Sequence, residues 1–166
     1  MNLRVVSCNH QSASLDVRSR LAFSPGDLPR AYEELRAEFP TSELVVLSTC
    51  NRVEVYTAHE PGQSPPTHEE VAHFLAKFHQ VPVEDFFGSL FERTGPDAIR
   101  HLFQVAASLD SMVLGEPQIV TQVKEAYSLA QQHATTGPLT HALFQRALGV
   151  SKRIRTSGLR PRRWSV

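Results

Sequence analysis

Two strand-forming runs joined by four polar residues set the framework of this chain. Residues 44–48 are mostly apolar and rich in β-branched side chains, and residues 53–56 alternate between apolar and polar. Such runs around a short polar loop are typical of two antiparallel strands joined by a tight turn. The quartet between them, Thr49-Cys50-Asn51-Arg52, is therefore expected at a strand end.

Helical periodicity surrounds this predicted hairpin. A short strand at residues 3–7 precedes a helix whose apolar stripe begins at Leu28, and Thr67 and Glu70 have the spacing of a capping box at a helix start. The patterns also predict a strand at residues 86–93. They predict three further helices, which run from 94 to about 109, from about 117 onwards, and from about 138 to 156. We therefore predict an α+β fold, in which a small, mostly antiparallel sheet is covered by helices and a single domain ends in a C-terminal helix.

Charge is distributed unevenly along the 166 residues. The chain has 17 basic and 17 acidic side chains, but six basic ones follow residue 150, which leaves 11 basic against 17 acidic in the main body. Broad, non-specific nucleic-acid binding by that body is therefore not expected. The basic end could attract phosphate, or it could be a solvated terminus.

Several classes of protein do not fit the sequence. No apolar run approaches the length of a membrane span, and the start lacks a basic segment followed by an apolar core, so we expect a soluble, cytoplasmic protein without a membrane partner. Two cysteines are too few for a disulfide framework, so free thiols are expected. The eight histidines show no zinc-ligand spacing with the cysteines, and we predict no metal site.

Cys50 is the first candidate for chemistry. A thiol in a polar loop is accessible, and a nearby cation such as Arg52 would favour the reactive thiolate. The alternative is a small, semi-buried structural cysteine, because spacing alone identifies no base. Cys8, on a predicted core strand, is expected to be structural.

His101 is a second candidate, for proton transfer. Helical geometry predicts that it projects from the polar side of its helix, opposite an apolar stripe formed by Ile99, Leu102, Phe103 and Ala106. A surface histidine without a role would show the same pattern.

Two further groups of polar residues could hold a ligand. Arg52, Glu54 and Tyr56 should share one side of their strand, where Arg52 could clamp a carboxylate or pair with Glu54. Gln118 and Gln122, one helical turn apart near a helix start, could hold an anionic or amide-bearing ligand or simply face water.

Two long blocks of the sequence resemble the glutamyl-tRNA reductase family. They are residues 48–56, STCNRVEVY, and the stretch from RHLF at 100–103 through LDSMVLGEPQI at 109–119. Shorter matches are Asn9-His10, residues 20–23 and Lys152-Arg153. The resemblance covers residues 1–156 as the family's N-terminal catalytic domain and leaves 157–166 as a divergent basic tail.

The resemblance implies an NADPH-dependent oxidoreductase of the C5 pathway of tetrapyrrole and heme biosynthesis. Cys50 would attack the ester of glutamyl-tRNA to form a thioester, which NADPH reduces to glutamate-1-semialdehyde, with His101 as the proton-handling partner. The implied substrate pocket comprises Thr49, Asn51, Arg52, Ser111, Glu116, Pro117, Gln118 and Gln122. Glutamyl-tRNA is the implied partner, glutamate-1-semialdehyde aminomutase is a further candidate, and the family forms homodimers through a separate domain.

The sequence also departs from the family. Its eight glycines contain no Gly-x-Gly-x-x-Gly, so the NADPH-binding and dimerisation domains are expected to be absent from these 166 residues. On this interpretation the chain forms the thioester or hydrolyses the ester without completing the hydride step. The alternative is a non-catalytic module that binds glutamyl-tRNA or a partner of the pathway.

Overall fold

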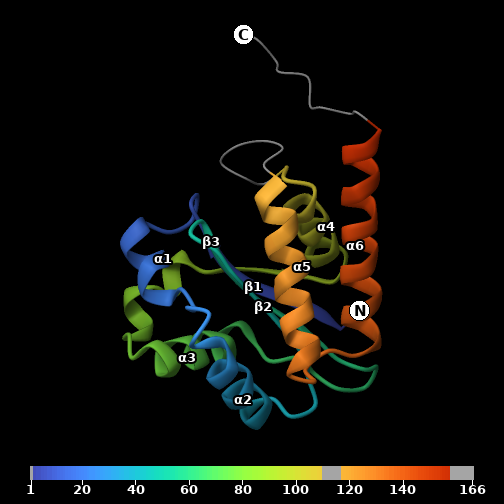
Figure 1. Ribbon diagram of the computed structural model, residues 1–166. Coiled ribbons are helices and arrows are strands. Elements are labelled where there is room, and N and C mark those ends of the chain that lie inside the picture. The colour runs from blue at the N-terminus through green and yellow to red at the C-terminus, as the bar shows by residue number, and fades with distance from the viewer. Residues whose placement is uncertain (1, 110–116, 158–166) are drawn as a thin grey trace.

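A computed structural model describes residues 2–109 and 117–157 and shows one antiparallel sheet of four strands (Figure 1). The strands are β1 (Leu3–Asn9), β2 (Glu43–Ser48), β3 (Arg52–Ala58) and β4 (Phe91–Thr94), in the order β2-β3-β1-β4. β2 and β3 form the predicted hairpin around residues 49–51. The α+β fold class is confirmed.

Helices cover both faces of the sheet (Figure 1). One group consists of α1 (Leu15–Leu21), α2 (Leu28–Glu38) and α3 (His68–His79). The other group consists of α4 (Gly95–Ala106), α5 (Pro117–Gln132) and α6 (Pro138–Thr156). Because both faces are covered, every residue of β3 is buried, and in β1 every residue except Arg4 is buried.

The start signals of two helices act as predicted. At α3, the Thr67 hydroxyl accepts from the backbone N–H of Glu70, and the Glu70 carboxylate accepts from that of Thr67. α6 has the predicted bounds, and Glu43 of β2 holds its first turn by accepting from the N–H of Thr140 at 2.7 Å. Gly137 fits here because a Cβ at that position would lie 2.7 Å from the Glu43 carboxyl carbon.

The strand predicted at residues 86–93 is wrong in its first half. Two 3₁₀ turns, Val83–Asp85 and Phe87–Ser89, precede β4, and the N–H of Ser89 donates to the carbonyl of Phe86 at 2.8 Å. Phe86 itself is buried in the core. An apolar side chain can be buried from a turn as well as from a strand. A prediction based on composition alone therefore started the strand too early.

The outer edge of β2 is closed by side chains and a loop rather than by another strand. The N–H of Val46 donates to the Tyr32 hydroxyl at 2.9 Å, and that of Leu44 donates to the Thr135 carbonyl at 2.7 Å. The Thr135 hydroxyl returns a hydrogen bond to the Leu44 carbonyl at 2.9 Å. These partners satisfy backbone groups that an open edge would expose to pairing with another chain.

We expect Tyr32→Phe to lower the free energy of unfolding by about 1–3 kcal/mol, because the buried N–H of Val46 loses its acceptor. Urea unfolding measures the loss, and hydrogen exchange at Val46 should accelerate. Tyr127→Phe is the control, because the Tyr127 hydroxyl bonds the part-buried ring of His141 rather than a backbone amide. Unchanged stability of Tyr32→Phe would contradict this account of the edge.

Candidate functional site

A row of polar side chains lies in the middle of the sheet. Arg52, Glu54 and Tyr56 alternate along β3 and so share one face, and each is at most 1% exposed. The Arg52 guanidinium donates to Glu54 Oε1 at 2.9 Å, and the Tyr56 hydroxyl donates to Glu54 Oε2. The pairing of Arg52 with Glu54, one of the two alternatives that the sequence left open, is thus present within one strand.

His101 reaches this row from α4. Its Nε2 lies 2.8 Å from Glu54 Oε1, the oxygen that also accepts from Arg52. An ionised carboxylate can only accept, so Nε2 carries a proton and donates it. Whenever the ring is neutral, Nδ1 is therefore its acceptor nitrogen. Glu54 therefore fixes both the orientation and the tautomer of His101.

Glu54 remains ionised although it is fully buried. Burial alone would raise the pKa of its carboxyl. Three neighbours outweigh this effect: His101 by its hydrogen bond and charge, Arg52 by its charge, and Tyr56 by its hydrogen bond. The result lowers the pKa of Glu54 to about 2. The Glu54 network, meaning Arg52, Glu54, Tyr56 and His101, is a charged cluster inside the fold.

The prediction that His101 projects from the polar side of its helix is wrong. His101 is only 6% exposed and faces the sheet, together with Ala98, Leu102 and Val105. Ile99 and Phe103 are only partly buried, and α4 ends at Ala106 rather than near residue 109. Helical periodicity alone favours the exposed side of a helix for a polar residue. His101 faces inward instead, because its partner Glu54 is buried in the sheet.

Cys50 lies at the tip of the hairpin and is exposed. The turn is closed by the N–H of Thr49, which donates to the Arg52 carbonyl at 2.9 Å, and by the N–H of Asn51, which donates to the Thr49 hydroxyl at 3.2 Å. Of the two cysteines, Cys8 is buried in the core, as predicted, and burial raises the pKa of its thiol to about 11. Cys50 is thus the accessible thiol.

A small hollow of about 30 Å³ separates the hairpin tip from the start of α5. Cys50 lines it together with five of the eight predicted substrate-binding residues, namely Thr49, Asn51, Arg52, Gln118 and Gln122. Pro117 is the first residue of α5 and is exposed, outside this lining. Ser111 and Glu116 lie outside the described residues.

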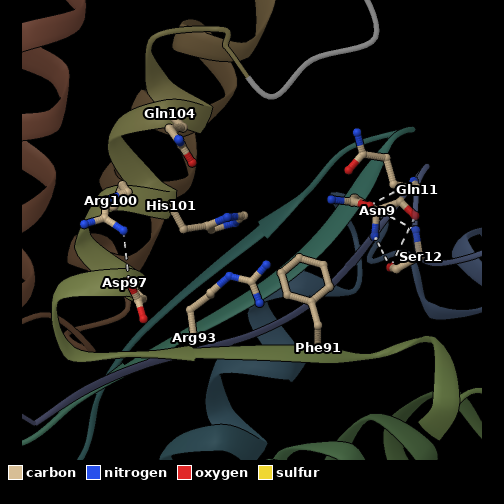
Figure 2. A pocket seen from close by; sticks show the side chains of 9 residues that line it. All are labelled: Asn9, Gln11, Ser12, Phe91, Arg93, Asp97, Arg100, His101 and Gln104. Atoms are coloured by element: carbon tan, nitrogen blue, oxygen red, sulfur yellow. Dashed lines mark hydrogen bonds and ion pairs between the residues drawn. The ribbon is translucent and has the colours of Figure 1, made fainter.

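His101 lines a different and larger cavity, of about 360 Å³ (Figure 2). The ring points from α4 toward the end of β1, with Phe91 and Arg93 of β4 beneath it and Asn9 across from it. Asn9 pairs directly with Arg52 across the sheet. The two predicted catalytic residues therefore occupy adjoining parts of the fold, connected through Arg52 and Glu54.

Sequence reasoning gave Glu54 and Tyr56 only a structural part in the site, and it did not consider Asn9 as a lining residue. A signal for Glu54 was available, because a carboxylate in the middle of a strand that is otherwise apolar needs a buried partner. The strand pattern could not identify that partner, since His101 lies 47 residues away.

Within residues 2–109 and 117–157, no helix is long and apolar enough to cross a bilayer, and no group of three His, Cys, Asp or Glu side chains could hold a metal ion. A dinucleotide does not fit these residues either. Among the described strands, β4 leads directly into a helix, and that helix begins with Gly95, Pro96 and Asp97. Pro96 lacks the N–H that would bind a pyrophosphate, and the negative charge of Asp97 would repel one.

Comparison with known proteins identifies the family. A family model described as "Glutamyl-tRNAGlu reductase, N-terminal domain" matches residues 6–158. The chain belongs to the glutamyl-tRNA reductase family. This assignment confirms the resemblance carried by the two long sequence blocks.

Relatives and a solved structure of the family match almost the whole chain. Glutamyl-tRNA reductases of Marinobacter nauticus and Neisseria meningitidis are 44% and 42% identical to it over 156 residues, 94% of this chain. A glutamyl-tRNA reductase structure from Methanopyrus kandleri superposes with a TM-score of 0.73 at 29% identity and also covers 94% of the chain. The match spans about a third of each relative's length, 35–36%.

We expect Glu54→Gln to lower the free energy of unfolding at pH 7 by about 3–5 kcal/mol, because it removes a counter-charge from buried Arg52. The folded-state pKa of Glu54 is below its ordinary value of 4.5, so its stabilisation is present above about pH 4.5 and is lost as pH falls toward 2. The difference in free energy of unfolding between wild type and Glu54→Gln, measured by urea unfolding, should therefore become smaller as pH falls from about 4.5 toward 2.

The control is Glu34→Gln, which breaks a surface ion pair with Arg30 and should change stability by less than about 1 kcal/mol. A difference between wild type and Glu54→Gln that stays constant from pH 7 to pH 2 would contradict the ionised state of Glu54.

Proposed function

We propose that this chain is the acyl-transfer part of a glutamyl-tRNA reductase, in which Cys50 receives the glutamyl group. The observation that carries the proposal is the exposed Cys50 thiol in a hollow shared with Thr49, Asn51, Arg52 and Gln122. Domain boundaries at residues 1–156 and a basic tail at 157–166 belong to the same proposal.

The chemistry suits a thiol. The Cys50 thiolate attacks the carbonyl carbon of the ester that joins glutamate to the terminal ribose, a carbon–sulfur bond forms, and the carbon–oxygen bond breaks. The ribose oxygen leaves and takes up a proton. A thioester accepts hydride more readily than the oxygen ester that it replaces, which explains the use of sulfur at this position.

His101 is proposed as the group that handles the proton. Its Nε2–H is held by ionised Glu54, so Nδ1 is the nitrogen available to accept a proton. A neighbouring carboxylate also stabilises the imidazolium that forms when the ring is protonated. Glu54 acts through His101 and is a positioning residue.

Arg52 and the two glutamines are proposed to recognise the glutamyl group. The α-carboxyl of glutamate is engaged in the ester, so the carboxylate left for recognition is that of its side chain. Arg52 lines the hollow and offers a planar set of donors that suits a carboxylate. Gln118 and Gln122 line the opposite wall, on α5.

NADPH supplies the hydride in the family's reaction, which yields glutamate-1-semialdehyde for tetrapyrrole synthesis. The described residues do not suit a dinucleotide, so the step proposed for this part of the chain is acyl transfer. A thioester that receives no hydride would be hydrolysed, and the expected activity of the chain alone is release of glutamate.

Incubation of the 166-residue chain with glutamyl-tRNA tests the proposal. We expect mass spectrometry of acid-quenched protein to show one glutamyl group on the peptide that contains Cys50, and none after Cys50→Ser. Cys8→Ala is the control and should retain the adduct, because Cys8 is buried. An adduct that persists in Cys50→Ser would reject the proposal, and saturable RNA binding without any adduct would favour the binding module.

A second variant tests the proton transfer. We expect His101→Asn to slow adduct formation at saturating glutamyl-tRNA by about 10²- to 10⁴-fold, the usual contribution of a general acid or base, with little change in the concentration that gives half the maximal rate. Single-turnover quenching measures both quantities. His73→Asn, exposed on α3, is the matched control, and equal rates for wild type and His101→Asn would remove His101 from the reaction.

A further inference from the structure

The cavity beside His101 contains side chains for which the proposed acyl transfer has no use. Phe91 and Arg93 of β4 and Arg100 of α4 line it together with Asp97, and Figure 2 shows them gathered on the side of the cavity nearest the helix and β4. They differ in kind from the uncharged wall formed by Asn9 and the turn after β1.

The charge of this cavity is locally positive. Asp97 pairs with Arg100 at 3.2 Å, and the pair is exposed. Arg93 has no carboxylate partner among the described residues, and its guanidinium lies 4.6 Å from the centre of the Phe91 ring. Arg93 is exposed, and its guanidinium donates to the backbone carbonyl of Glu92 at 3.1 Å. An arginine without a counter-charge beside a cavity suits an anionic ligand.

The ring beneath the guanidinium indicates what kind of anion would fit. Phe91 is only half-buried and makes an edge contact with His101 at 5.7 Å between ring centres. An accessible aromatic ring combined with arginine is the usual means by which proteins hold single-stranded nucleotides, with the base stacked and the phosphate paired. At about 360 Å³ the cavity has the size of a pocket for one small molecule and not that of a duplex groove.

The position of the cavity relative to Cys50 supports the same ligand. Asn9 of its lining pairs across the sheet with Arg52, and Arg52 lines the hollow that contains Cys50. A substrate whose ester lies at the thiol could therefore extend its adjoining nucleotide toward the strand that bears Asn9.

We propose that this cavity binds a nucleotide of the single-stranded 3′ end of glutamyl-tRNA, with the phosphate on Arg93 and Arg100 and the base against the part of the Phe91 ring that Arg93 leaves uncovered. The proposal rests on the proposed function, because it assigns the RNA part of the same substrate. Recognition of one terminal nucleotide is consistent with a main body whose net negative charge opposes broad RNA binding.

Binding of a fluorescent single-stranded RNA that ends in CCA to the full 166-residue chain tests this site without any chemistry at Cys50. We expect Arg93→Gln to weaken binding about tenfold, as for loss of one charged hydrogen bond, and to reduce the salt slope by about 0.7. Asp97→Asn should tighten binding, since it removes the negative charge. Arg36→Gln, an exposed arginine on α2, is the matched control and should bind as wild type does.

A second arm separates this proposal from the acyl transfer itself. With a small glutamyl thioester that lacks RNA, Arg93→Gln should form the Cys50 adduct at the wild-type rate. Equal RNA affinity of wild type and Arg93→Gln, or an equal loss of rate with the small thioester, would overturn the nucleotide site while leaving the Cys50 proposal intact. Loss of RNA affinity in Arg93→Gln together with an adduct in Cys50→Ser would retain the site and reject the proposed reaction.

Discussion

An ionised carboxylate buried in the sheet determines the arrangement of the site. Glu54 has no exposed surface, and its two oxygens accept from Arg52 and Tyr56 on its own strand and from His101 on α4. Removing such a charge from water is costly unless donors surround it, so the network requires α4 to pack with His101 inward. Tyr56 extends the constraint to α6, where its ring packs edge-on against Phe144 at 5.3 Å.

The site therefore has two parts, a rigid network inside the sheet and an accessible thiol at the tip of the hairpin. The Glu54 network is fixed on strand β3 and helix α4, where positions are held by packing, whereas Cys50 lies in the turn that joins β2 to β3. Arg52 belongs to both, because it pairs with Glu54 and lines the hollow beside the thiol. A group held at Cys50 would therefore meet residues whose orientation is set deep in the sheet.

Sequence patterns predicted the parts of this structure that depend on local physics. The β2–β3 hairpin, the capping box at Thr67 and the bounds of α6 follow from alternation and start signals within a few residues. The side of α4 that bears His101 could not be predicted in this way, because it depends on Glu54, 47 residues earlier in the chain. The early start predicted for β4 failed for a related reason, since the buried Phe86 packs from a turn.

A carbon-13 NMR titration of the Glu54 side-chain carboxyl tests the central claim most directly. With the side-chain carboxyl carbon labelled in glutamate and the resonance assigned by Glu54→Gln, the account predicts no titration between pH 7 and about pH 4, and a pKa of about 2 if the fold persists that far. A Glu54 resonance that titrates at or above the ordinary value of 4.5, or that is already protonated at pH 7, would contradict it.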